Sequence, residues 1–256
     1  MGKRKYLLII FISVFSLTFV SLLGFYSKNP EISNCIIVSL SDEFEIINGN
    51  LYLSKDTPEG LKDSVIKVLK KADKRACEYW NIEKQSENPK IIFCYSHDTF
   101  EKYSKSKTII SYKTPLGFYI VFGEGFIDLD MLSHEICHSE LFSRIGFINS
   151  IREIPTWFDE GVAMQVDYRE EYSEEKYNEI KESKPHKINF ENIRTVETFW
   201  SGEYYYNYIE SRHEVKKWIK EVGEKGLEKL IERIREGEQF DEVYRQMREE
   251  CMNGNE

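Results

Sequence analysis

The pattern of apolar positions changes period along the chain. Apolar residues recur every three or four positions from Leu61 to Trp80, which predicts an amphipathic helix. Short runs rich in β-branched and aromatic residues predict strands instead. The predicted strands cover residues 35–40, 44–47, 51–53, 91–95 and 117–122. Because helices and strands are mixed in this way, we expect an α+β fold with a small mixed sheet.

Helical periodicity dominates the second half of the chain. One predicted helix begins at Asp128 or Asp130, either of which can cap it, and ends at Gly146. The next begins at Thr156, which forms a capping-box-like pattern with Asp159 three residues later. Further helices are predicted over residues 204–222, 226–235 and 240–247. The C-terminal part is therefore expected to be helical.

The N-terminal segment has a different composition. Lys3, Arg4 and Lys5 precede an uncharged apolar run from Tyr6 to Tyr26. At ~1.5 Å per helical residue, this run spans roughly the 30 Å of a bilayer core. The basic cluster before it predicts that the chain after Ser27 lies outside the cytoplasmic membrane. The segment therefore predicts one transmembrane helix and a single-pass location in the cell membrane.

A cleavable signal peptide is the alternative for this segment. Such peptides usually have a shorter apolar region, about 7–15 residues, followed by a small-x-small cleavage site. The residues around Gly24 match that site poorly, which favours an uncleaved anchor. Cleavage would instead predict a secreted protein.

Composition narrows the class of partner. With 41% hydrophobic and 14% aromatic residues, the chain can bury a substantial core. The formal net charge of -9 argues against nucleic acid as a partner, because phosphate binding needs a concentrated basic surface. The five cysteines have no repeated spacing, so they predict neither a CxxC metal cluster nor a disulfide framework.

The segment LSHEICHSEL (residues 132–141) carries the candidate chemistry. His134 and His138 are four residues apart, so on a helix both rings project from one face and can bind one zinc ion. Glu135 lies about 100° further round the helix, within reach of a water on the ion. A catalytic zinc site has three protein ligands and leaves the fourth position to water. A third ligand is therefore expected.

The third ligand is expected in the following predicted helix. Glu160 lies in the segment WFDEG and is separated from His138 by residues 139–159. By itself it is equally explained as a carboxylate that interacts favourably with a helix N-terminus. Its position after an HExxH motif, between Trp157 and Gly161, favours a zinc ligand.

These motifs resemble those of the gluzincin metallopeptidases, in particular the peptidase MA-like group, which pairs HExxH with a glutamate in a W-x-x-E-G context. The resemblance implies that His134, His138 and Glu160 bind Zn²⁺ and that Glu135 is the general base. It also implies a zincin-like domain, and it accounts for about residues 57–250.

A late Y-x-x-S motif extends the resemblance. It runs from Tyr208 to Ser211, and it implies Tyr208 as the donor that stabilises the oxyanion, with Tyr206 and His213 as rivals in the same helix. The aromatic cluster around Tyr206 is equally explained as core. His213 is favoured as a surface or hydrogen-bonded residue.

Two positions depart from the family pattern or need a separate explanation. Thermolysin-type enzymes carry an aspartate four residues after the ligand glutamate, where this chain has Met164. Asp167 lies on the same helical face and either orients a histidine or is exposed to solvent. Cys137, inside the motif, points away from both rings and is expected to be a buried structural thiol.

The strand before the metal helix is the expected substrate site. In enzymes of this kind an exposed strand edge binds an extended peptide through backbone hydrogen bonds. We therefore expect Tyr119, Ile120 and Val121 to bind substrate. The alternative is an interior strand without such a role.

Together these features predict three regions: a signal anchor or signal peptide (1–27), a short β-rich lead-in (28–56) and a gluzincin-like metallopeptidase domain (57–256). The expected activity is hydrolysis of peptide bonds in a peptide or protein substrate, through a zinc-activated water with Glu135 as general base. One alternative is a catalytically degenerate gluzincin that serves as a binding or assembly module. The other is a zinc hydrolase that acts on a non-peptide amide.

Overall fold

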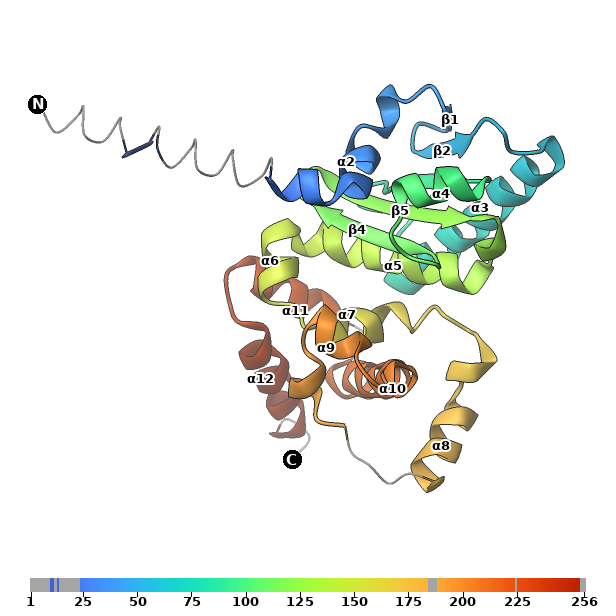
Figure 1. Cartoon of the computed structure of the whole chain (residues 1–256). Coiled ribbons are helices and arrows are strands. Elements are labelled where there is room, and N and C mark those ends of the chain that lie inside the picture. Colours follow the sequence, from blue (N-terminus) through green and yellow to red (C-terminus); the bar gives the residue numbers. More distant parts are fainter. Residues whose placement is uncertain (1–9, 12, 14–23, 184–187, 224, 254–256) are drawn as a thin grey trace, which may run out of the picture.

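A five-stranded mixed sheet lies at the centre of the N-terminal half. The computed structural model describes residues 10–11, 13, 24–183, 188–223 and 225–253 (Figure 1). The strands are β1 (Phe44–Ile47), β2 (Leu51–Ser54), β3 (Lys90–Cys94), β4 (Ile110–Thr114) and β5 (Gly117–Gly123), in the order β1-β2-β3-β5-β4. β2, β3 and β5 run parallel, whereas β1 and β4 are antiparallel to their neighbours. The predicted α+β class and mixed sheet are confirmed.

Helices precede the sheet, connect its strands and make up most of the C-terminal half. The helices are α2 (Pro30–Ile36), α3 (Glu59–Trp80), α4 (His97–Tyr103), α5 (Leu129–Ile145), α6 (Phe147–Arg152), α7 (Thr156–Ala163), α8 (Glu174–Ser183), α9 (Val196–Trp200), α10 (Tyr204–Val222), α11 (Gly226–Arg235) and α12 (Phe240–Asn253). Short 3-10 helices are η1 (Val38–Leu40), η2 (Glu124–Phe126), η3 (Glu170–Tyr172) and η4 (Phe190–Ile193). The helices predicted over 204–222 and 226–235 have the expected bounds.

Helices cover both faces of the sheet, whose central strands β3 and β5 are apolar on both sides. In β3, Phe93 packs with residues of α3 and α5, whereas its neighbour Ile92 packs with residues of α2 and α4. Successive side chains of a strand point to opposite faces, which explains this division. Figure 1 shows α5 along the lower side of the sheet, next to β4. The candidate metal helix is therefore held directly against the sheet.

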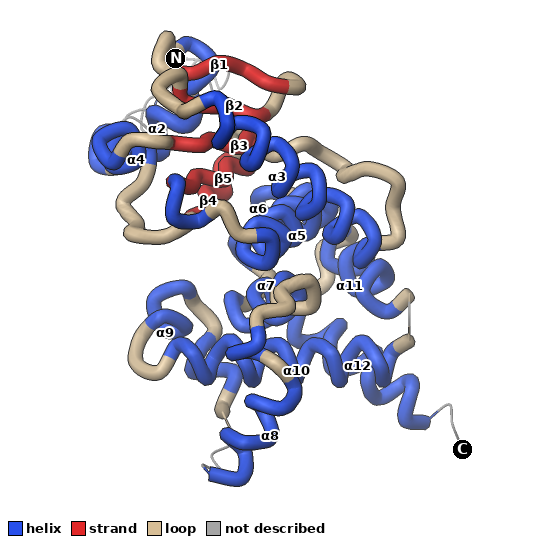
Figure 2. The backbone as a smooth tube through the Cα atoms, turned by 90° about the vertical axis from the view of Figure 1, so that its right-hand side faces the viewer, coloured by secondary structure: helices blue, strands red, loops and turns tan. Residues whose placement is uncertain are grey.

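Helix α7 packs between α5 and α10 (Figure 2). Its contact with α10 is close at Gly161, where a Cβ atom would lie 2.5 Å from Cγ2 of Val215 and 2.6 Å from the carbonyl oxygen of Ser211. Only glycine fits this contact without a shift of one of the two helices. The small residues at 161 and 211 thus let α10 support the segment that carries Glu160.

The structure corrects the reading of residues 35–40, which form the end of α2 and η1 rather than a strand. Pro30 at the start of α2 favours a helix, and Cys35 and Val38, three residues apart, are both buried. The rest of the lead-in, residues 44–54, forms an antiparallel pair of strands, and β2 then pairs in parallel with β3. Residues 28–56 are thus built into the same fold as the rest of the described chain.

The structure also corrects the expectation for the N-terminus. The apolar run from Tyr6 to Tyr26 predicts a transmembrane helix, but most of that run (residues 6–9, 12 and 14–23) lies outside the described residues. Among the residues that the structure describes, none of the helices combines the length and apolar character needed to cross a membrane. The membrane-spanning helix, and the single-pass location that depended on it, are therefore not supported.

Candidate metal centre

Helix α5 presents both histidines of the HExxH motif on one face. It begins at the N-cap Asp128, whose side chain accepts a hydrogen bond from the backbone N–H of Met131 at 2.9 Å, and it ends at Gly146 with φ of +83°. Both of these predicted ends are confirmed. His134 and His138 are buried, with ring centroids 4.7 Å apart and an interplanar angle of 80°.

The two imidazoles and Glu160 form a compact group of ligand atoms. Nε2 of His134 lies 3.0 Å from Nε2 of His138, and Oε2 of Glu160 lies 3.1 Å and 3.3 Å from these two atoms. Ligand bonds of about 2.0–2.2 Å would put the donor atoms of a tetrahedral zinc site roughly 3.3 Å apart. The three side chains thus fit one ion, and this group of residues could hold a metal ion.

Asp159 orients His138 from the other side of its ring. Oδ1 of Asp159 lies 2.7 Å from Nδ1 of His138, and its other oxygen pairs with Nζ of Lys113. An ionised carboxylate only accepts hydrogen bonds, so Nδ1 of His138 carries a proton, and Nε2 is the ring nitrogen that faces the ligand group. This role was not predicted from the sequence, which indicated a capping box between Thr156 and Asp159. Pro155 is instead the N-cap, and no described side chain caps α7.

Asp167 faces Nδ1 of His134, as Asp159 faces Nδ1 of His138. It is completely buried, so exposure to solvent, one of its two predicted readings, is wrong. Its Oδ2 lies 3.7 Å from Nδ1 of His134, an atom that is buried without a hydrogen-bond partner among the described residues. Arg169 holds the same carboxylate through Nε, at 3.0 Å and 3.1 Å, and through Nη2 at 2.5 Å. Asp167 thus faces the first histidine from a fixed position.

The buried charged residues of this group shift one another's pKa values. Burial alone would lower the pKa of His138, but the nearby carboxylates of Asp159 and Glu160 outweigh it and raise that pKa well above its usual value. Burial alone would raise the pKa of Glu160, but His138 and His134 lower it to about 2. The pKa of Asp159 also falls below its usual range, because Lys113 and His138 outweigh burial. The two carboxylates beside His138 therefore favour a positive charge on this ring, and a metal ion bound at Nε2 would take the place of a proton there.

Glu135, the predicted general base, is held by a residue of β4. The hydroxyl of Ser111 donates a hydrogen bond to Oε2 of Glu135. Two residues along the same strand, Lys113 pairs with Asp159. Strand β4 was not among the predicted strands, although Ile110 and Tyr112 alternate with Ser111 and Lys113 in the manner of a half-buried strand.

The strand expected to bind substrate is an interior strand of the sheet. Tyr119, Ile120 and Val121 lie in β5, which pairs with β3 on one side and with β4 on the other. All three are at most 1% exposed. An interior strand has no unpaired edge for a peptide, so the exposed edge expected at these residues is not present. The exposed edge nearest the ligand group belongs to β4.

Tyr208 lies beside the ligand group. Its ring centroid is 6.1 Å from that of His134, with an interplanar angle of 63°. Burial, together with the charges of Glu160 and Glu135, raises the pKa of Tyr208 well above its usual value, so the hydroxyl stays protonated. Of its two predicted rivals, His213 stacks on Tyr177 at 3.8 Å, and Tyr206 packs against Tyr205 with centroids 5.6 Å apart.

Cys137 has the structural role expected of it. It is completely buried, and its sulfur lies 3.8 Å from the carbonyl oxygen of Val162 in α7. Burial raises the pKa of this thiol far above its usual value, so it remains protonated. The residue therefore contributes to the contact between α5 and α7.

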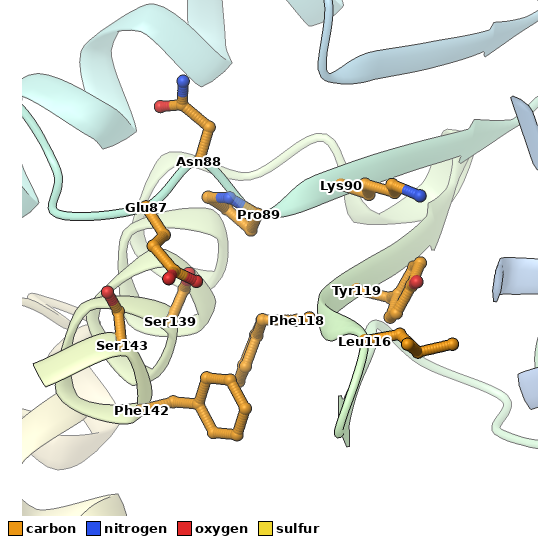
Figure 3. A pocket seen from close by; sticks show the side chains of 11 residues that line it. Glu87, Asn88, Pro89, Lys90, Leu116, Phe118, Tyr119, Ser139, Phe142 and Ser143 are labelled. Carbon is orange, nitrogen blue, oxygen red and sulfur yellow. The ribbon is translucent and has the colours of Figure 1, made fainter. Parts of the chain in front are cut away.

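Two cavities lie apart from the ligand group. One, of about 130 Å³, lies on another side of α5, where Ser139 and Ser143 face it beside Glu87, and Phe118 and Phe142 close it (Figure 3). A larger cleft of about 860 Å³ is lined by α4, η2 and the loop over residues 104–107. Neither contains a residue of the ligand group in its described lining.

Comparison of the chain with protein-family models, with curated proteins and with solved structures finds no match in any of the three. The geometry of the site is therefore the basis on which its function is argued.

Proposed function

We propose that this protein is a zinc-dependent metallopeptidase of the gluzincin type. The observation that carries the proposal is the group of three ligand atoms, 3.0–3.3 Å apart, with Glu135 adjacent on the same helix. Two imidazole nitrogens and one carboxylate oxygen are the ligand set of several catalytic zinc sites, which leave a fourth position for water. Carboxylates facing the outer nitrogen of each histidine further support a metal at this point.

A bound zinc ion would supply Lewis acidity, which polarises a carbonyl group and makes water a stronger nucleophile at neutral pH. Ser111 holds one oxygen of Glu135, which leaves the other oxygen to accept a proton from the attacking water. Glu135 then delivers this proton to the nitrogen of the leaving amine as the C–N bond breaks. The neutral hydroxyl of Tyr208 is the candidate donor to the carbonyl oxygen as negative charge develops there.

Strand β4 is the candidate site for the substrate backbone. It is an edge strand, and an extended peptide can add to such an edge through backbone hydrogen bonds. Ser111 and Lys113 direct their side chains to Glu135 and Asp159, so a peptide on this edge would lie next to the ligand group. This assignment replaces the one made for β5.

The test combines metal content with cleavage. Purified protein is expected to bind one zinc per chain and to cleave peptides in a casein digest, with products identified by mass spectrometry. Glu135→Gln should keep the metal and lose cleavage by on the order of 10³-fold or more, because the proton acceptor is gone. Exposed Glu78→Gln, on α3, is the matched control and should be active.

Other outcomes separate the alternatives. Zinc binding without cleavage that depends on Glu135 would favour a binding or assembly module. Cleavage of small amides but not of peptides would favour the non-peptide hydrolase. Full zinc occupancy in His134→Ala would show that the ligands are assigned wrongly.

A further inference from the structure

Exposed apolar side chains gather on α9 and the start of α10. Trp200 is 47% exposed and Tyr204 is 48% exposed, and their rings lie 5.6 Å apart with an interplanar angle of 34°. Val196, 67% exposed, lies one helical turn before Trp200 on the same side of α9. We call Val196, Trp200 and Tyr204 the α9 aromatic surface. Large apolar side chains left exposed together commonly mark a binding site.

This surface lies close to the candidate metal centre. The ring centroid of Trp200 lies 5.4 Å from that of Tyr208, and the ring of Tyr208 is in turn 6.1 Å from that of His134. A single ring therefore separates Trp200 from a ligand histidine. An extended peptide advances by about 3.3 Å per residue, so the surface lies within roughly three or four residues of a bond held at the ligand group.

The backbone beneath the α9 aromatic surface is firmly held. Phe199, next to Trp200, is completely buried, and its carbonyl oxygen accepts a hydrogen bond of 2.6 Å from Nδ2 of Asn207. The N-terminus of α9 carries a reciprocal capping box between Thr195 and Thr198. The rings are thus presented on a fixed support, which reduces the entropy lost when a ligand binds.

We propose that the α9 aromatic surface binds a bulky apolar or aromatic side chain of the peptide substrate, a few residues from the bond that is cut. This proposal rests on the proposed function, because it assigns the surface to a substrate of the same site. Flat rings such as Trp200 and Tyr204 offer a large apolar contact area and favour aromatic partners. Glu197 and Glu203 adjoin these residues in the chain, so an acidic side chain should be disfavoured there.

Binding to an inactive variant tests the proposal. The zinc-loaded Glu135→Gln protein is titrated into fluorescein-labelled alanine hexapeptides that carry a single phenylalanine at each position in turn, and anisotropy reports the Kd. At one or two positions phenylalanine should tighten binding on the order of tenfold over the all-alanine peptide, and aspartate should not. Trp200→Ala in the same background should abolish this gain, whereas Trp200→Phe should keep most of it.

The matched control is Leu40→Ala. Leu40 is 83% exposed and belongs to η1, which packs with α2 and α4 on the sheet face opposite α5. This variant should show the full gain for phenylalanine. An equal gain in the Trp200→Ala protein, or no gain for phenylalanine at any position, would overturn the proposal.

Cleavage separates this proposal from the function on which it rests. In the active protein, the residue preference of cleaved peptides should flatten in Trp200→Ala while cleavage still depends on Glu135. Loss of that preference without loss of Glu135 dependence supports both proposals. If the protein selects phenylalanine in the binding assay but cleaves no peptide, the role given to the α9 aromatic surface would stand and the peptidase activity would be rejected.

Discussion

Asp159 binds Nδ1 of His138 at 2.7 Å, and the residue that follows Asp159 supplies the third ligand atom of the group. Two consecutive residues of α7 thus face the same histidine from opposite sides, Asp159 at Nδ1 and Glu160 at Nε2. Lys113 of β4 balances the charge of this carboxylate. The candidate site is therefore supported by the sheet as well as by the helices.

Removing the charge of Asp159 should weaken metal binding. Asp159→Asn keeps the size of the side chain but loses the anion that fixes the His138 tautomer. We expect the Kd for zinc, measured by competition with a chromophoric chelator, to rise about ten- to a hundredfold. Asp241→Asn, which breaks an exposed ion pair with Arg194, is the control and should bind zinc normally. Equal affinity in the two variants would contradict the role given to Asp159.

The metal-free protein should lose stability at both ends of the pH range. The raised pKa of His138 contributes stability that is fully present below its unfolded value of 6.5 and is lost as the pH rises through the higher folded value. The lowered pKa of Glu160 contributes stability above its unfolded value of 4.5 that is lost as the pH falls toward about 2. The difference in Tm between zinc-loaded and EDTA-treated protein should therefore grow between pH 6 and pH 9.

As the pH rises, protons also compete less with zinc for His138, so zinc binds more tightly. This tighter binding and the loss of stability of the metal-free protein both increase the difference in Tm. His138→Gln is the control, because its metal-free form lacks this group and should show a smaller fall in Tm on the alkaline side. Metal-free wild type and His138→Gln with the same pH dependence of Tm would contradict this account.

Removing the hydroxyl of Ser111 should lower the turnover rate without changing metal binding. Ser111→Ala leaves Glu135 without its partner in β4, so the carboxylate is less well positioned to accept a proton. We expect kcat to fall about tenfold with zinc content unchanged. Ser64→Ala, which removes an exposed hydroxyl from α3, should leave kcat as it is. A change in zinc content in Ser111→Ala would show that the residue acts on the metal group as a whole.

Two glycine substitutions should change stability in opposite directions. Gly161→Ala puts a Cβ atom 2.5 Å from Val215 and forces α7 away from α10, at a cost of about 1–3 kcal/mol in the free energy of unfolding. Gly60→Ala, in the first turn of α3, meets no described atom within 4 Å and should stabilise the protein by roughly 0.5–1 kcal/mol. Urea unfolding followed by circular dichroism measures both. A neutral Gly161→Ala would mean that the two helices separate easily.

The displacement of α7 in Gly161→Ala should also weaken zinc binding. The backbone of residue 161 is adjacent to Glu160, so a shift of α7 moves a ligand atom relative to α5. We therefore expect Gly161→Ala to weaken zinc binding in the folded protein, and Gly60→Ala to leave it unchanged.

The sequence alone determined the two histidines of the ligand group, because their spacing is local. Two histidines four residues apart on a helix project from one face whatever surrounds the helix, and α5 begins and ends where its capping residues indicate. The periodicity of α10 and α11 determined their bounds in the same way. Glu160 was found through its motif, although the helix dipole explained it equally well.

Only the tertiary structure decided which other residues serve that group. Ser111 and Glu135 are 24 positions apart, and Lys113 and Asp159 are 46 apart, so no local pattern connects them. Strand order is likewise non-local: β5 has no free edge because it lies between β3 and β4, which an isolated run of apolar residues does not reveal. The short apolar run at residues 35–40 is helical, and its buried residues pack with those of α4 and the sheet, a contact that the run by itself does not reveal.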